Sequence, residues 1–152
     1  MESMEQLLAE HPFLQGLAPQ YLSRLASCAE VRQYAAGQFL FREGEEVREF
    51  FLVRHGQVAM EIYSARRGPI TVQTRQGGDI LGWIGLPPPY LWNFDGRAMV
   101  ITRTIAIRVE CLYQLCETDH EIGYTLLKRY VGAMAEHFKS LKLQLVDIIH
   151  GL

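Results

Sequence analysis

Apolar residues in the first thirty positions of the chain recur every three or four residues, which is the spacing of amphipathic helices. Pro12, Gly16 and Pro19 interrupt this spacing, and proline and glycine are the residues that most often end regular structure. The pattern therefore predicts two or three short helices between residues 4 and 29.

From Val31 onward the spacing changes to short alternating segments separated by glycines. We expect strands at 38–41, 50–53, 58–63, 70–73, 98–101 and 104–107. Short strands with a turn about every ten residues are typical of an antiparallel sandwich or barrel, whereas βαβ units need helix-length connections. The turns at 54–57 and 66–69 are expected to close hairpins. The segment 82–94, rich in proline and aromatic residues, is expected to be an insert outside the strands.

Helical spacing returns after Val109. Thr118 and Glu121 have the spacing of a capping box, which predicts a long helix that starts at about residue 119. Along this helix, apolar residues alternate spacings of three and four and define a seam: Val131, Met134, Phe138, Leu141, Leu145, Ile148 and Leu152. A helix of about 32 residues is roughly 48 Å long, which exceeds what the core of one small domain needs. The seam therefore predicts a homodimer, and the alternative is that the same stripe packs on the protein's own sheet.

Charge is distributed unevenly along the chain. The formal net charge is -2, whereas nucleic-acid-binding proteins generally carry a basic excess, so we expect no direct binding to DNA or RNA. Only the segment 51–110 carries a net positive charge, and every basic residue in it is an arginine. Arginine suits bidentate contact with phosphate or carboxylate, so an anion site is expected in this region. The alternative is that these arginines are solvated at strand edges.

Neither metal chemistry nor catalysis is expected. The three cysteines, Cys28, Cys111 and Cys116, cannot all pair and form no CxxC motif, so a disulfide framework or structural zinc site is disfavoured. The motifs GxxxxGK[ST], GxGxxG, HExxH and GxSxG do not occur, which removes support for the common enzyme classes. No cofactor is required by these patterns, although a haem ligand at His55 stays an open alternative.

The chain is also expected to be cytoplasmic and not membrane-bound. Its N-terminus lacks the basic and apolar regions of a signal peptide, and no stretch approaches about 18 apolar residues.

Three segments taken together resemble the cyclic-nucleotide-binding domain family, which includes the sensor half of catabolite-activator-like transcription factors and the regulatory subunit of protein kinase A. They are His11–Leu14 with Gly16 and Leu17, Tyr34–Gly44, and Phe50–Val53 with Gly56–Val58. The likeness covers nearly the whole chain. It implies a mainly β fold, an antiparallel β-roll or jelly-roll (double-stranded β-helix) with N-terminal helices and a long C-terminal dimerisation helix. We expect one domain over 1–152, with N-terminal helices at 1–30, the β-roll at 31–109, a ligand cassette at 78–100 and C-terminal helices at 110–152.

The resemblance also implies a phosphate site. In the family, a glycine turn binds the cyclic phosphate through backbone N–H groups, a glutamate holds the ribose, and an arginine pairs with the phosphate. Here Gly82 keeps the turn, but Trp83 stands where the glutamate belongs, and an indole cannot accept the hydroxyl proton of ribose.

The register of the arginine is open. If Ala98 is the anchor, Gly96 takes the place of the arginine, and Arg97 points to the opposite face of the strand unless a bulge turns it back. If Arg97 itself is the anchor, the counter-ion is kept and Met99 stands where the family has alanine.

These observations predict a regulatory sensor that binds a small anionic or nucleotide ligand, such as a cyclic nucleotide, and signals through its C-terminal helix to an unknown downstream protein. The residues expected to bind the ligand are Leu81, Gly82, Trp83, Ile84, Gly85, Trp92, Arg97, Ala98, Met99 and Tyr130. The dimer interface is expected at Val131, Met134, Phe138, Leu141, Leu145 and Ile148. The main alternative is a degenerate sensor whose aromatic residues, Trp83, Tyr90, Trp92 and Phe94, fill the pocket, so that the domain serves dimerisation or protein interaction. Regulation of DNA through a separate partner protein is a further alternative.

Overall fold

A computed structural model describes residues 2–151 of the chain. Three short helical segments come first: α1 (Met4–Glu10), the 3-10 helix η1 (Pro12–Leu14) and α2 (Pro19–Ala26). Proline opens both η1 and α2, where its fixed φ angle suits the first helical turn. The prediction of two or three short helices is confirmed. The strand that follows them, Ala29–Tyr34, was not among the predicted strands.

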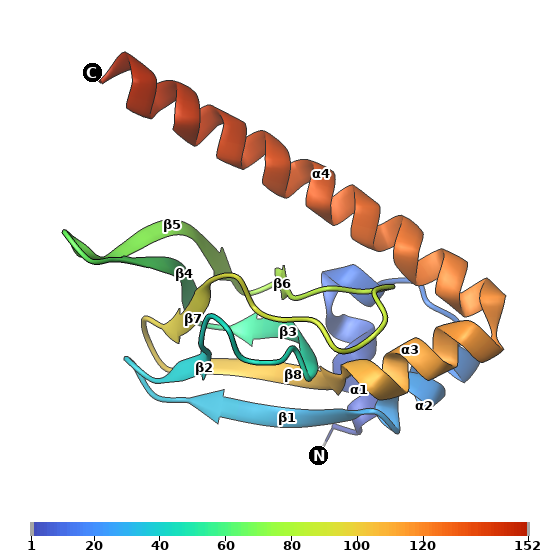
Figure 1. The fold of residues 1–152 in the computed structure, drawn as a ribbon. Coiled ribbons are helices and arrows are strands. Elements are labelled where there is room, and N and C mark those ends of the chain that lie inside the picture. Colours follow the sequence, from blue (N-terminus) through green and yellow to red (C-terminus); the bar gives the residue numbers. More distant parts are fainter. Residues whose placement is uncertain (1, 152) are drawn as a thin grey trace.

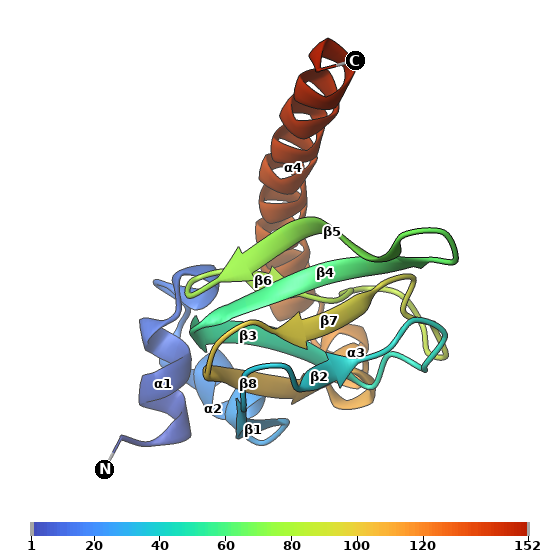
Figure 2. The same cartoon turned by 90° about the vertical axis from the view of Figure 1, so that its left-hand side faces the viewer.

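Eight strands form two four-stranded sheets in which every pairing is antiparallel (Figures 1 and 2). The first sheet has the order β1 (Ala29–Tyr34), β8 (Thr102–Arg108), β3 (Glu49–His55) and β6 (Ile80–Leu81). The second has the order β2 (Phe39–Phe41), β7 (Asp95–Ala98), β4 (Gln57–Ser64) and β5 (Gly68–Gln76). Residues Phe50–Val53 of β3 are fully buried in the core. The expected fold class, mainly antiparallel β with flanking helices, is confirmed.

Only one of the two expected hairpin turns closes a hairpin. Residues 66–69 join the paired strands β4 and β5, as predicted. Residues 54–57 instead form a corner, because β3 and β4 belong to different sheets. Gly56 makes this corner possible: its φ is +104°, and a Cβ atom there would lie 2.6 Å from the Cα of Thr102.

The segment between β6 and β7 is free of named strands, as expected for the insert at 82–94, and holds one isolated bridge from Leu91 to Glu46. The strand predicted at 98–101 is wrong. β7 ends at Ala98 and the chain bends over the next three residues before β8 starts at Thr102.

Two helices end the chain, α3 (Val109–Thr118) and α4 (His120–His150). The N-cap of α4 is Asp119, whose carboxylate accepts the backbone N–H groups of Glu121 and Ile122. The prediction that Thr118 caps this helix is therefore wrong; its hydroxyl donates back to the carbonyl of Gln114 in α3.

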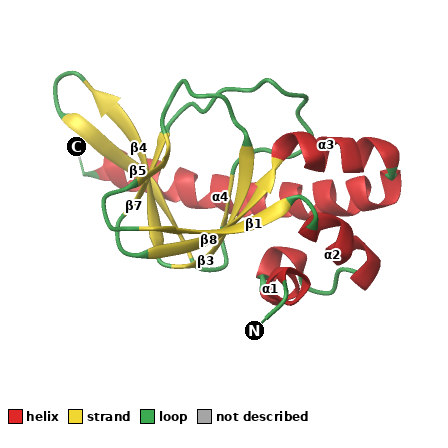
Figure 3. Cartoon of the chain, turned by 90° about the horizontal axis from the view of Figure 1, so that it is seen from below, coloured by secondary structure: helices red, strands yellow, loops and turns green. Residues whose placement is uncertain are grey.

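The long C-terminal helix itself is as expected. Its first part packs on the β-roll through buried residues such as Ile122 and Leu126, and the helix runs across one side of the strands (Figure 3). Residues 141–150 are exposed and project from the body (Figures 1 and 2). Leu152, the last residue of the predicted seam, lies outside the described residues.

The sequence disfavoured a disulfide framework, but the structure contains one disulfide. Cys28 and Cys111 form a disulfide, with their Cα atoms 5.8 Å apart and 83 residues between them in sequence. The bond ties the junction of α2 and β1 to the first turn of α3, and Cys116 is free. Sequence motifs could not reveal this pair because the fold alone brings the two residues together.

Candidate functional site

The predicted cassette turn packs directly on the hydrophobic core. Gly82 has a φ of +120°, and a Cβ atom there would lie 3.3 Å from Phe50 and 3.4 Å from Trp92. Leu81 and Ile84, which flank the turn, are buried. Glycine is therefore required at position 82 both for its backbone conformation and for the close approach.

Helix α4 contacts the same turn at two points. The phenol of Tyr130 donates a 2.7 Å hydrogen bond to the carbonyl oxygen of Gly82. One turn earlier on the helix, Leu127 lies so close to Gly85 that a Cβ atom there would be 2.7 Å from its Cδ2. Burial raises the pKa of Tyr130, so its hydroxyl stays protonated and keeps donating. The cassette and α4 are thus mechanically joined.

The interior beside the turn is filled by aromatic rings. Trp92 is only 3% exposed, and its ring stacks on Phe41 with a centroid separation of 3.5 Å and an interplanar angle of 7°. Phe94 meets Trp92 edge-on at 5.8 Å. Ala98, on β7, is fully buried. Any ligand that touches Trp92 or Ala98 must first displace the protein's own side chains.

Arg97 lies on the opposite face of β7 from this interior. A Cβ atom at Gly96 would run into the ring of Phe41, so residue 96 faces the core, and the next residue of a strand faces the other way. The Nε and Nη2 atoms of Arg97 donate to the two carboxylate oxygens of Glu61 on β4, at 2.9 and 2.8 Å. The geometry agrees with the register anchored on Ala98.

The Arg97–Glu61 ion pair changes the pKa of both residues. The hydrogen bond from Arg97 lowers the pKa of Glu61, and the bond from Glu61 raises the pKa of Arg97. Both groups therefore stay charged at neutral pH, and the arginine fork is occupied by a carboxylate of the protein. Met99, which follows on the bend, is exposed. A ligand-binding role for Arg97 or Met99 stays a prediction that this geometry does not favour.

A groove of about 690 Å³ separates β5 from α4. Its lining residues are Gln73, Trp83, Tyr130, Val131, Met134, Ala135, His137, Phe138 and Leu141. Trp83 and Tyr130 were expected to bind a ligand, whereas four of the helix residues were expected to form the dimer seam. The fold brings both groups to one groove. In the single chain Val131 and Phe138 are exposed, by 65% and 70%, whereas Met134 is half-buried and packs against the core.

Three polar residues were not expected as site residues: Gln73 and His137, which line this groove, and Arg75, which is hydrogen-bonded to Gln73. Gln73 and Arg75 project from β5 and are buried, and His137 lies opposite them on α4. The side-chain nitrogen of Gln73 donates to the backbone carbonyl of His137 at 3.3 Å. The sequence held one signal for Arg75, the arginine-only basic charge of residues 51–110.

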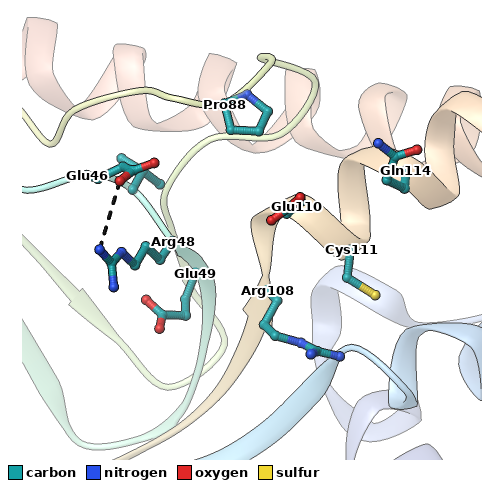
Figure 4. Close-up of a pocket in the computed structure, with 9 residues that line it drawn as sticks. Glu46, Arg48, Glu49, Pro88, Arg108, Glu110, Cys111 and Gln114 are labelled. Carbon is teal, nitrogen blue, oxygen red and sulfur yellow. Dashed lines mark ion pairs between the residues drawn. The ribbon is translucent and has the colours of Figure 1, made fainter.

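A second cleft of about 690 Å³ lies between the loop before β3, Pro88 of the insert and the start of α3 (Figure 4). Glu46 and Arg48 form an ion pair at 4.0 Å, and Arg108 donates to the backbone carbonyl of Ser27. The lining holds three glutamates, Glu46, Glu49 and Glu110, against the two arginines Arg48 and Arg108. The cleft therefore offers no net attraction for an anion.

Within residues 2–151, no cluster of three or more His, Cys, Asp or Glu side chains is arranged to hold a metal ion. No helix of the same range is long and apolar enough to cross a membrane.

Comparison with solved structures gives close matches of fold. A protein from Geobacter metallireducens GS-15, described as a cyclic nucleotide-binding protein, is 25% identical, with a TM-score of 0.76 over 90% of this chain and 98% of that one. A cyclic nucleotide-binding domain from Methylobacillus flagellatus KT is 16% identical, with a TM-score of 0.78 over 95% and 82%. The catabolite activator protein of Thermus thermophilus is 20% identical, with a TM-score of 0.68 over 91% and 63%.

No curated protein sequence matches the chain. The family model described as the cyclic nucleotide-binding domain matches residues 31–119, a span that contains all eight strands except the first two residues of β1, together with the cassette and α3. The match covers more than half of the sequence, and the structural neighbours share its architecture. The chain therefore belongs to the cyclic nucleotide-binding domain family.

Proposed function

We propose that this domain is a regulatory sensor that binds a small anionic or nucleotide ligand at the β-roll and passes the signal on through α4. The hydrogen bond from Tyr130 to the carbonyl of Gly82 carries this proposal. It joins the turn that resembles the family's phosphate cassette to the only long helix of residues 2–151. Leu127 provides a second contact at Gly85.

The proposed mechanism follows from these two contacts. A ligand shifts a conformational equilibrium only as far as it binds one conformation more tightly than the other. A ligand that moves the backbone between Gly82 and Gly85 changes the carbonyl position that Tyr130 requires and the space that Leu127 occupies. Helix α4 must then tilt or slide, and its exposed end carries the change outward.

Thermal unfolding with cyclic AMP, cyclic GMP and cyclic dinucleotides tests ligand binding. A ligand at a hundred times its dissociation constant stabilises the folded state by about 2.7 kcal/mol, which corresponds to several degrees. The variant Tyr130→Phe keeps the ring and removes only the donor. We expect it to retain the ligand-induced shift while losing the ligand-induced change in hydrogen exchange along α4. An α4 response that is unchanged in Tyr130→Phe would contradict the coupling.

The same proposal includes a homodimer formed through the seam on α4. Phe138 and Ile148 are exposed in the single chain, and pairing of two helices would cover them. We expect sedimentation to show a dimer at tens of micromolar protein and Phe138→Glu to shift it toward monomer. Leu143→Glu is the matched control, because Leu143 is also exposed on α4 but lies outside the seam. A wild-type monomer would refute the dimer.

A second candidate function is favoured by one specific observation, the stacking of buried Trp92 on Phe41. The domain would then be a degenerate sensor that serves dimerisation or protein interaction through α4. The nucleotide titration separates the two proposals, because a filled interior predicts no stabilisation by any nucleotide together with an intact dimer.

A further inference from the structure

We propose that the groove between β5 and α4 binds an amphiphilic anion, and that Arg75, Trp83 and His137 bind its charged group. Such a ligand has a flat apolar body that carries one phosphate, carboxylate or sulfonate group. This inference rests on the proposed sensor function. It places the anionic group away from Arg97 and assigns its binding to residues on β5, the cassette and α4.

The burial pattern of β5 is inverted compared with an ordinary strand. Arg75 is only 7% exposed and Gln73 is also buried, whereas the apolar residue Ile70 is 40% exposed. Burying polar groups is unfavourable unless they are hydrogen-bonded, and burying an unpaired charge is more so. Breaks of this local rule concentrate at functional sites. The buried polar side chains of β5 therefore indicate contact with a polar or charged ligand at the groove.

Arg75 has no carboxylate partner. Among residues 2–151 it forms no ion pair within 4.0 Å, and its hydrogen bonds go from one terminal nitrogen to the side-chain oxygen of Gln73 at 3.0 Å and to the carbonyl of Thr74 at 3.4 Å. A guanidinium has five N–H donors, so most of them stay unused. Burial lowers the pKa of Arg75, which reflects the unfavourable loss of water around its charge. An anion beside it would offset this loss.

Unpartnered polar groups gather at this one place. In the described part of the chain, four buried side-chain polar atoms lack a hydrogen-bond partner, and three of them are Arg75 Nε, Trp83 Nε1 and His137 Nδ1. Trp83 and His137 line the groove, and Gln73 connects Arg75 to it. Burial and the neighbouring charge of Arg75 lower the pKa of His137, and Asp79 opposes this only as a weaker influence. The imidazole is therefore neutral and can present Nδ1 as an N–H donor.

The carboxylate whose charge acts on Arg75 is hydrogen-bonded to the backbone instead. Asp79 acts on Arg75 through its charge, but its carboxylate accepts the backbone N–H of Gln76 at 2.9 Å and so holds the turn after β5. It does not form an ion pair with Arg75 within 4.0 Å, which leaves the guanidinium available to a ligand.

The opposite wall of the groove favours a ligand with a large apolar part. It is formed by side chains of α4 that include Val131, Met134, Phe138 and Leu141. A flat apolar group attached to the anion would pack on these side chains, which an inorganic ion cannot do. The combination of apolar walls with a few convergent donors thus favours an amphiphilic anion over a bare phosphate.

The probe for the test is 1-anilinonaphthalene-8-sulfonate, and its control is N-phenyl-1-naphthylamine, which has the same rings without the sulfonate. Cyclic AMP forms a third arm. NMR titration follows the two indole N–H signals, assigned through the loss of one signal in Trp83→Phe. We expect the sulfonate probe to shift the Trp83 signal more than that of Trp92, which is buried in the core.

Binding constants then test the role of the charge. Arg75→Gln should weaken the sulfonate probe roughly ten- to a hundred-fold, as expected for loss of a charge-assisted bond, and should leave the uncharged control unchanged. Arg103→Gln is the matched control and should change neither, because Arg103 is exposed on β8, which belongs to the other sheet. Arg75→Lys keeps the charge, so it should retain part of the affinity and covers the case in which Arg75→Gln fails to fold.

The outcomes are distinguishable. Equal binding of both naphthalene probes, unaffected by Arg75→Gln, would overturn the inference and leave an apolar surface suited to a second copy of α4. Cyclic AMP binding that survives Arg75→Gln would overturn it while the sensor proposal stands. Sulfonate binding that depends on Arg75, with no response to any cyclic nucleotide, would support the anion site and reject a nucleotide as the ligand.

Discussion

Reduction of the Cys28–Cys111 disulfide is expected to destabilise the protein strongly. A cross-link stabilises mainly by restricting the unfolded chain, and the effect grows with the length of the loop that it closes. For the separation of 83 residues, the chain-entropy relation gives about 4.5 kcal/mol at 25 °C. At roughly 2–4 °C per kcal/mol for a chain of this size, the melting temperature should fall by roughly 9–18 °C.

The assay is thermal unfolding followed by circular dichroism, with and without a thiol reductant. Cys28→Ala should unfold at a low temperature in both conditions, and Cys116→Ser should behave like wild type, because Cys116 is free. Thiol titration of the denatured protein verifies the state of the bond: one free thiol is expected before reduction and three after it. A wild-type melting temperature that changes by less than about 3 °C upon verified reduction would refute the entropic reasoning.

The remaining predictions concern an ion pair, an aromatic stack and a backbone corner. Arg97→Gln should lower the free energy of unfolding by about 1–2 kcal/mol at pH 7, because Glu61 loses its charged partner. Since the pKa of Glu61 is lowered in the folded state, this contribution is present above about pH 4.5 and is lost as the pH falls through the lowered pKa. Denaturant titrations at pH 7 and pH 3 should therefore show the difference from wild type shrinking, and a constant difference would contradict the assignment. Trp92→Ala should lower stability by about 3–5 kcal/mol through the cavity that it leaves, and Trp92→Phe by clearly less; equal losses would argue against tight stacking. Gly56→Ala should destabilise more than Gly37→Ala in the same titration, because both glycines have a positive φ but only Gly56 faces backbone atoms within 4 Å.

The sequence pattern was sufficient for the architecture but not for the way that the strands are shared between sheets. Alternation and glycine turns located most strands within a few residues, and the motif resemblance supplied the fold class. The corner at Gly56 had the same local signature as the hairpin at residues 66–69. Only the pairing of β3 with β8 and of β4 with β7 distinguishes the corner from the hairpin. Such long-range pairing cannot be inferred from the sequence of a four-residue turn.

The residues of the candidate site were likewise predicted only in part. Gly82 and Trp83 were predicted from the cassette motif and Tyr130 from the long helix, and the structure brings these three residues together. Arg75 escaped notice because alternation along β5 indicates a strand without saying which face is buried, and the usual assumption that apolar residues face inward is reversed there.

The length of α4 makes it a lever arm. Residues 131–149 extend from Tyr130, the point where the helix is fastened to the cassette. At a rise of about 1.5 Å per residue this arm is roughly 29 Å long, so a tilt of about 10° at Tyr130 would carry its far end sideways by roughly 5 Å. That travel is comparable to the distance of about 5–6 Å between neighbouring side chains on one face of a helix. A displacement too small to alter the β-roll visibly is therefore large enough to bring different residues of α4 into register with whatever lies against its exposed end.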